Sequence, residues 1–108
     1  MLPYTIEEIK ARVAPIAAKY SLAAVYLFGS YARGDASADS DVDLLVDLSG
    51  SGVRGLGLGR LYNELEDALG VRIDLVTLDS LEQQTTFRSD ALFRENVKRE
   101  RRMIYAVA

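Results

Sequence analysis

The chain has 108 residues, a formal net charge of -3, and neither cysteine nor histidine. This length suits one domain with one core, so we expect residues 1–108 to form a single domain. Without these two residue types there is no disulfide, no thiolate zinc site and no histidine general base, and any metal must be held by oxygen. The acidic balance argues against general nucleic-acid binding, which depends on Lys and Arg.

Hydrophobic residues make up 49% of the chain, and the apolar runs are only a few residues long. We therefore expect a globular protein without a membrane-spanning segment. The N-terminus, MLPYTIEEIK, carries acidic residues where a secretory signal would carry basic residues and then an apolar stretch. This pattern predicts a cytoplasmic location.

The first predicted element is a helix over residues 5–20. Thr5 is suited to cap it, and Glu8 three residues later completes a capping box. Pro15 conflicts with a continuous helix, because an interior proline costs about 3 kcal/mol. We expect a bend near residues 11–12, or a helix that starts again with Pro15 in its first turn.

Three apolar runs, at residues 23–28, 42–48 and 71–78, are typical of buried strands. The expected connections are a helical turn at 31–35, a loop at 34–40, a mobile glycine-rich loop at 49–59, a helix at 58–69 ended by Gly70, and a last helical region from 79 or 80 to about 105. Glycines at 55, 57 and 59 do not complete a dinucleotide fingerprint, because position 60 is arginine. The alternation of helices and strands indicates the α/β class.

Gly29 and Ser30 follow the first predicted strand and precede a helical turn. Glycine allows the backbone to approach a phosphate closely, and the amides that open the turn favour an anion. The Ser30 hydroxyl adds another donor. Taken alone, a Gly-Ser pair after a strand is equally typical of an ordinary turn.

Asp41 and Asp43 begin the second predicted strand. Residues two apart in a strand point to the same face, so their carboxylates lie side by side. Two such charges about 4 Å apart repel by about 4 kcal/mol at an effective dielectric of 20. A divalent cation would offset this repulsion directly. The alternative is that both carboxylates face water at a frayed strand end.

Asp74 lies inside the third predicted strand, where a buried and unpaired carboxylate would be costly. On a strand next to Asp41 and Asp43 it becomes a third metal ligand. Three carboxylates are able to hold two magnesium ions about 3.5 to 4 Å apart, as in two-metal phosphoryl chemistry. An ion pair with Arg72 is the alternative role for Asp74.

These residues carry a resemblance to a known family. The segments Gly29-Ser30-Tyr31-Ala32-Arg33-Gly34 and Ser40-Asp41-Val42-Asp43-Leu44 resemble the signature of the polymerase β nucleotidyltransferase superfamily. Asp74 sits where that superfamily keeps its third aspartate. The short chain and the single helix before the first strand resemble the minimal nucleotidyltransferase (MNT) branch, over about residues 13–105.

The resemblance implies a small mixed β-sheet flanked by helices, of the α/β (or α+β) class. It also implies that Gly29 and Ser30 hold the triphosphate of ATP, and that Arg33 braces the loop or meets a phosphate. Ser40, at the start of the second motif, is a further candidate nucleotide-binding residue.

The same resemblance assigns the metal site and the catalytic residues. Asp41 and Asp43 would bind both Mg²⁺ ions, while Asp74 would complete one site and help to activate the attacking hydroxyl.

Many MNT proteins resemble antitoxins whose partner is an all-helical HEPN ribonuclease toxin, and the known chemistry of the branch is transfer of AMP from ATP to a tyrosine of the toxin. We therefore expect a Mg-dependent protein adenylyltransferase that acts as an antitoxin. The alternatives are a non-catalytic antitoxin that acts by binding and a small-molecule nucleotidyltransferase. The basic segment 93–102 is either a partner surface or a solvated helix end, and the oligomeric state, including a homo-oligomer, is left open.

Overall fold

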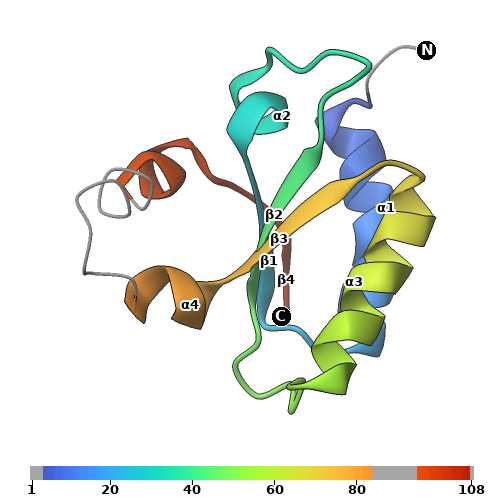
Figure 1. Cartoon of the computed structure of the whole chain (residues 1–108), viewed down its shortest axis with the longest axis vertical. Helices are drawn as coiled ribbons and strands as arrows, with labels where there is room; N and C mark the ends of the chain where they lie inside the picture. Colours follow the sequence, from blue (N-terminus) through green and yellow to red (C-terminus); the bar gives the residue numbers. More distant parts are fainter. Residues whose placement is uncertain (1–3, 84–94, 108) are drawn as a thin grey trace.

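The computed structural model describes residues 4–83 and 95–107. The elements, in chain order, are α1 (Ile6–Lys19), β1 (Ala24–Phe28), α2 (Gly29–Arg33), β2 (Val42–Asp47), α3 (Leu56–Leu69), β3 (Ile73–Thr77), α4 (Leu78–Gln83) and β4 (Arg102–Ala106), with residues 95–100 also helical (Figure 1). Within these residues no helix has the length and apolarity needed to cross a bilayer.

The strands form one four-stranded sheet in the order β3-β2-β1-β4. β1 is antiparallel to both of its neighbours, β2 and β4, whereas β2 and β3 run parallel. A parallel pair needs a crossover connection, and α3 supplies it. The predicted small mixed sheet flanked by helices, of the α/β class, is confirmed.

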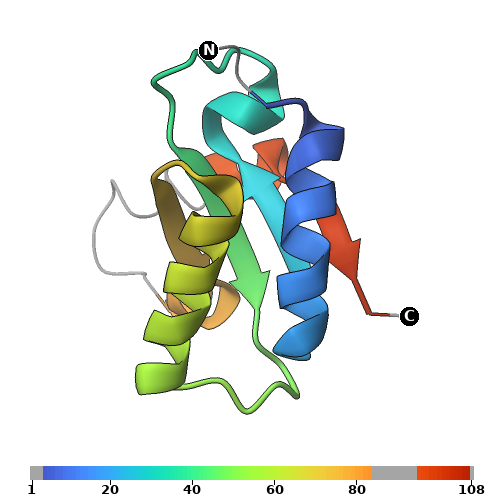
Figure 2. The same ribbon diagram turned by 90° about the vertical axis from the view of Figure 1, so that its right-hand side faces the viewer.

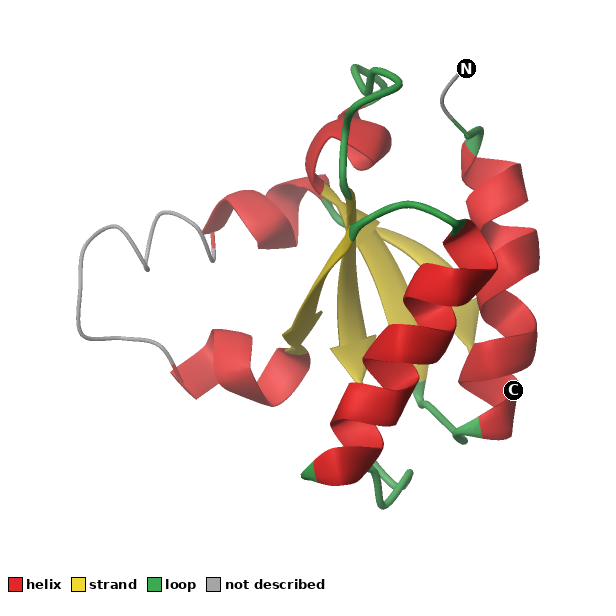
Figure 3. Cartoon of the chain, turned by 45° about the vertical axis from the view of Figure 1, so that its right-hand side comes forward, coloured by secondary structure: helices red, strands yellow, loops and turns green. Residues whose placement is uncertain are grey.

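The two faces of the sheet are covered by different helices. α1 and α3 lie side by side on one face (Figure 2), and we call this the α1/α3 face. α4 and the helical segment 95–100 lie on the opposite side (Figure 3), which we call the cleft face. The larger core is under α1 and α3, and the smaller core on the cleft face consists of Phe28, Leu45, Leu81 and Val97.

α1 begins as the sequence predicts, with the Thr5 side chain accepting from the Glu8 amide and the Glu8 side chain accepting from the Thr5 amide. The prediction that the helix starts again at Pro15 is wrong, because one helix runs from Ile6 to Lys19. Pro15 is exposed, and so is Ala11, whose carbonyl loses its helical partner. Water is therefore able to satisfy that carbonyl.

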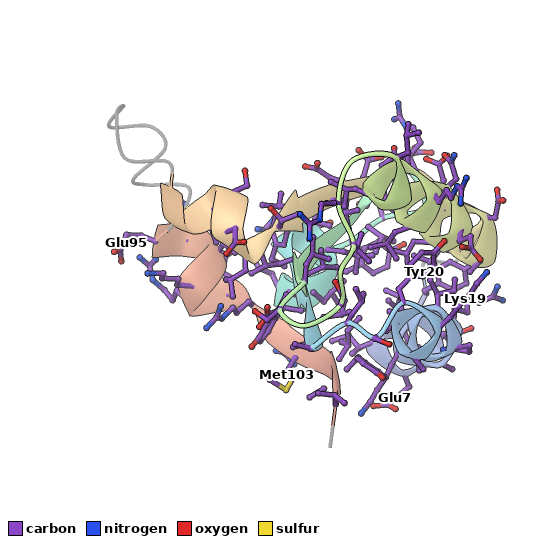
Figure 4. The ribbon with its side chains drawn as sticks, turned by 90° about the horizontal axis from the view of Figure 1, so that it is seen from below. Glu7, Lys19, Tyr20, Glu95 and Met103 are labelled. Carbon is purple, nitrogen blue, oxygen red and sulfur yellow. The ribbon has the colours of Figure 1, made fainter. Side chains whose placement is uncertain are left out.

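Hydrogen bonds at both ends of α1 tie it to α3. The Tyr4 hydroxyl donates to the carbonyl of Leu69 at 2.5 Å. At the other end, Lys19 lies 2.6 Å from Glu64, and the Tyr20 hydroxyl also donates to Glu64. Lys19 and Tyr20 are seen beside α3 in Figure 4. These contacts hold the two helices together over the larger core.

α3 begins at Leu56, so part of the expected mobile loop at 49–59 is helical instead. The two glycines in its first turn are poor helix formers, but burial of Leu61 and Leu65 favours the helix strongly enough to offset them. The helix ends at Gly70, which has a positive φ of 69° as predicted for a C-terminal glycine.

The end of the chain departs most from its prediction. α4 starts at Leu78, and residues 102–106 form a strand rather than the end of a last helix. Part of that predicted helix, residues 84–94, lies outside the described residues. β4 forms because β1 needs a partner on its second edge, and because Ile104 is buried there with only 2% of its surface exposed.

Candidate functional site

The turn after β1 is packed directly against β2. α2 begins at Gly29 itself, two residues earlier than the predicted helical turn, and Gly29 has a φ of +72°. A Cβ atom at this position would collide with the carboxylate oxygen Oδ2 of Asp43. Only glycine therefore fits here, because both the backbone conformation and the space exclude a side chain.

The sheet register brings two of the predicted carboxylates together. In the parallel pair of β2 and β3, Asp43 is in register with Asp74. On the other side of β2, Asp43 is in register with Phe28, the residue that precedes Gly29. Asp41 lies two residues before Asp43, just ahead of β2. Asp43 therefore lies between the Gly-Ser turn on one side and Asp74 on the other.

The environment of Asp43 is unfavourable for a carboxylate ion. Its pKa is raised from an ordinary value of 3.8 to about 6, first by burial and then by the negative charges of Asp74 and Asp41. The guanidinium of Arg33 acts in the opposite direction, to a smaller extent. A cation bound among these groups would relieve this unfavourable energy.

All of the residues predicted from the sequence as site residues line one cleft of about 480 Å³. They are Gly29, Ser30, Arg33, Ser40, Asp41, Asp43 and Asp74. The structure thus gathers these residues from α2, the loop before β2, β2 itself and β3 at one end of the sheet, and their individual roles stay predictions.

Arg33 joins two elements at the rim of the cleft. Its Nε lies 3.2 Å from Asp35, and its Nη1 lies 3.1 Å from Glu100 in the helical segment 95–100. The first contact fits the expectation that Arg33 braces the loop. Ser40 closes a turn in the same loop, where its hydroxyl accepts from the Ser37 amide at 2.8 Å.

The alternative prediction, an ion pair between Arg72 and Asp74, is wrong. Arg72 pairs with Asp41 instead, with 3.4 Å between Nε and Oδ1. Within the described part of the chain, no three acidic side chains are drawn together closely enough to form a ready metal site. The ion pair with Arg72 explains why Asp41 is not grouped with the other two carboxylates, because it draws the Asp41 side chain toward Arg72.

The donor set nevertheless suits a hard cation. All three carboxylates line the same cleft, and the chain has no histidine or cysteine that would favour a softer metal. Arg72 is highly exposed, with 82% of its side-chain surface accessible, and such surface ion pairs contribute little energy. Asp41 is therefore able to exchange Arg72 for a metal ion at small cost.

The cleft has a second wall that the sequence analysis did not identify. Besides the predicted residues, Phe28, Asn96, Val97 and Glu100 line it. Three of these come from the helical segment 95–100, whose residues the sequence analysis did not assign to the site. The spacing of 96, 97 and 100 along a helix was the available signal, because these positions share one face.

Comparisons with known proteins agree with this arrangement. The family model described as a nucleotidyltransferase domain matches residues 6–104. The protein adenylyltransferase MntA of Thermococcus cleftensis is 39% identical over 85 residues, which cover 75% of this chain and 85% of that protein. The match to the family model covers β1, β2, β3 and the start of β4, together with the residues that line the cleft.

Solved structures share the fold at lower identity. A chain of a toxin-antitoxin complex with AMP-PNP gives a TM-score of 0.68 at 21% identity, covering 91% of this chain and 73% of that one. A second chain comes from the complex of the tri-AMPylated HEPN toxin of Shewanella oneidensis with MNT antitoxin. It gives a TM-score of 0.64 at 18% identity, covering 95% of this chain and 74% of that one. At these identities the likeness shows the fold alone.

Proposed function

This chain belongs to the nucleotidyltransferase domain family, and on that premise we propose that it transfers AMP from ATP to a hydroxyl group of a partner protein. The observation that carries the proposal is the single cleft in which the Gly29-Ser30 turn meets three carboxylates on two adjoining strands. A nucleotidyltransferase needs both a phosphate-binding turn and acidic side chains beside it, and a cleft that joins a Gly-Ser turn to three carboxylates supports that assignment.

The turn at Gly29 is suited to the triphosphate. Because Gly29 has no side chain, the Asp43 carboxylate packs directly against the turn, and Ser30 lines the same cleft. Backbone amides and a hydroxyl donate hydrogen bonds to phosphate oxygens without adding bulk. In the described part of the cleft lining, Arg33 is the cationic side chain, and we assign it to a phosphate or to bracing the loop through its pairs with Asp35 and Glu100.

We assign the metal site to Asp41, Asp43 and Asp74, which would hold Mg²⁺. When bound, Mg²⁺ neutralises negative charge on the triphosphate and on the departing pyrophosphate. The pKa of Asp43 is raised by burial and by the charges of Asp74 and Asp41, so a bound cation would stabilise the ionised form of this carboxylate most. Asp74 is exposed at the cleft, and we assign it to accept the proton of the incoming hydroxyl. The hydroxyl oxygen then bonds to the α-phosphorus, while the bond from that phosphorus to pyrophosphate breaks and pyrophosphate leaves.

The acceptor we propose is a tyrosine hydroxyl of a HEPN-type toxin, which makes the protein an antitoxin acting in the cytoplasm. The relative from Thermococcus cleftensis is named a protein adenylyltransferase, and one chain of similar fold comes from a complex with an AMPylated HEPN toxin. Another comes from a toxin-antitoxin complex with AMP-PNP. These names support a protein acceptor and an adenine nucleotide.

The test is transfer of labelled AMP to a purified HEPN-type protein in the presence of magnesium, starting with any such protein encoded next to this chain. We expect label on a tyrosine of that protein, identified by peptide mass spectrometry, and no label when EDTA replaces magnesium. Protection of the partner's RNA substrate without any label would favour the non-catalytic antitoxin. Labelling of a small hydroxylated molecule but not of the protein would favour a small-molecule nucleotidyltransferase.

A further inference from the structure

The helical segment 95–100 is held firmly against the cleft by contacts of three kinds. Val97 is buried in the smaller core, with only 2% of its surface exposed. Glu100 pairs with Arg33 of α2 at 3.1 Å. Just after the segment, Arg101 stacks over the ring of Tyr26 in β1 at 4.5 Å. The position of this helical wall relative to the Gly29-Ser30 turn is therefore set by the fold.

Asn96 stands on this wall and lines the cleft. It precedes the buried Val97 and lies one helical turn before Glu100, so these three side chains share the helix face that meets the cleft. Glu95, directly before it, extends away from the body of the molecule (Figure 4). Among the described residues that line the cleft, Asn96 provides the neutral amide side chain.

The other polar groups of the described lining already have partners or assigned roles. Arg33 and Glu100 pair with each other, Ser40 accepts from the Ser37 amide, and Asp41 pairs with Arg72. Asp43 and Asp74 are assigned to the metal, and Ser30 to the phosphates. The Asn96 amide makes no hydrogen bond within the part of the chain that the structure describes. It is thus available to a ligand.

We propose that Asn96 is a specificity-determining residue that hydrogen-bonds the edge of the nucleobase. This inference rests on the proposed function, which puts an adenine nucleotide in the cleft. A side-chain amide offers one donor group and one acceptor, and the edge of adenine offers an acceptor ring nitrogen beside its amino donor. The cleft volume of about 480 Å³ leaves room for a base and sugar beyond the phosphates.

The test separates the base from the phosphates by using two probes. Calorimetry in magnesium would compare ATP with inorganic tripolyphosphate, for wild type, Asn96→Ala and Asn63→Ala. Asn63 is the matched control, because it is exposed on α3 and borders a separate cavity beside Lys19 and Tyr20. We expect Asn96→Ala to weaken ATP binding about 5- to 30-fold and to leave tripolyphosphate binding unchanged. Asn63→Ala should change neither.

A base contact also predicts a change in selectivity. The ratio of ATP to GTP affinity should fall toward one in Asn96→Ala, and circular dichroism should show an unchanged fold because Asn96 is exposed. The inference is overturned if the variant binds ATP as wild type does, or if it loses ATP and tripolyphosphate equally. If wild type binds neither probe, the proposed function fails and the inference with it. If wild type binds both, only the inference is at stake.

Discussion

The α1/α3 face and the cleft face of the sheet are made by alternate residues of the same strands. Along β2, Val42, Leu44 and Val46 are fully buried on the α1/α3 face, whereas Asp43 lies on the other face. The first face excludes charge and holds the larger core. The second combines a smaller core with three carboxylates that repel one another.

The contrast indicates that the α1/α3 face supplies most of the folding stability. On the cleft face, repulsion between the carboxylates lowers stability but provides the groups we assign to metal binding. A side chain on the α1/α3 face should affect unfolding and leave ligand binding to the folded protein unchanged. A carboxylate on the cleft face should chiefly affect ligand binding, and removing its charge should leave stability equal or slightly higher. Substitutions on the two faces therefore test whether folding stability and ligand binding depend on different side chains.

The largest effect expected is the loss of transfer in Asp43→Asn. Asparagine keeps the size of the side chain but removes the charge that we assign to magnesium. We predict at least a thousandfold lower rate of AMP transfer, about 4 kcal/mol in the activation barrier. The rate of labelling of the partner protein would measure it, with circular dichroism as the check on folding. A folded variant that transfers at the wild-type rate would refute the assignment.

The next effect is the loss of stability in Leu65→Ala. Leu65 is fully buried on α3, under the α1/α3 face, so its truncation leaves a cavity in the larger core. We predict a loss of about 2 to 5 kcal/mol in the free energy of unfolding, measured by urea denaturation. ATP affinity should be unchanged under conditions where the variant is fully folded. A weakened affinity there would show that the two faces are coupled.

A smaller effect is expected at the phosphate-binding turn. Ser30→Ala removes a hydroxyl that we expect to donate to a charged phosphate, and it should weaken triphosphate binding by about 1 to 3 kcal/mol. Calorimetry with inorganic tripolyphosphate measures this directly. Ser49→Ala, in the exposed loop after β2 at the end of the strand away from the cleft, is the control and should bind as wild type does.

The smallest effect concerns the metal-free protein. Asp43 has a pKa of about 6 in the folded state, above its ordinary value of 3.8, so its ionisation opposes folding. Wild type should therefore lose stability as the pH rises from about 4 to about 6, while Asp43→Asn lacks this loss. At pH 7 in EDTA we predict that the variant is more stable by about 1 kcal/mol, because solvent screens part of the repulsion. Urea unfolding at pH 4 and pH 7 would test this, and an equal difference at both would contradict it.

Sequence reasoning recovered the parts of the molecule that short-range patterns encode. The apolar runs predicted β1, β2 and β3, and the two-part motif identified residues that do line one cleft. Gly29 was recognised as a glycine that permits close approach, and the group that the structure packs against it is the Asp43 carboxylate. Sequence reasoning expected Asp74 on a strand next to Asp41 and Asp43, and the parallel pairing of β2 and β3, with Asp43 in register with Asp74, agrees with it.

The missed features depend on contacts between distant parts of the chain. β4 forms because β1 leaves an edge to be paired, so a segment with helical appearance becomes a strand. Asn96 joins the cleft only because Val97 is buried and Glu100 meets Arg33.

We propose that the carboxylates of the cleft face hold a metal on which nucleotide binding depends, and calorimetry of ATP binding to wild type, with magnesium and then with EDTA, tests this. We predict binding in magnesium at millimolar ATP or below, and a marked loss of affinity in EDTA. Equal affinity in both conditions, or no binding at millimolar ATP in magnesium, would contradict it.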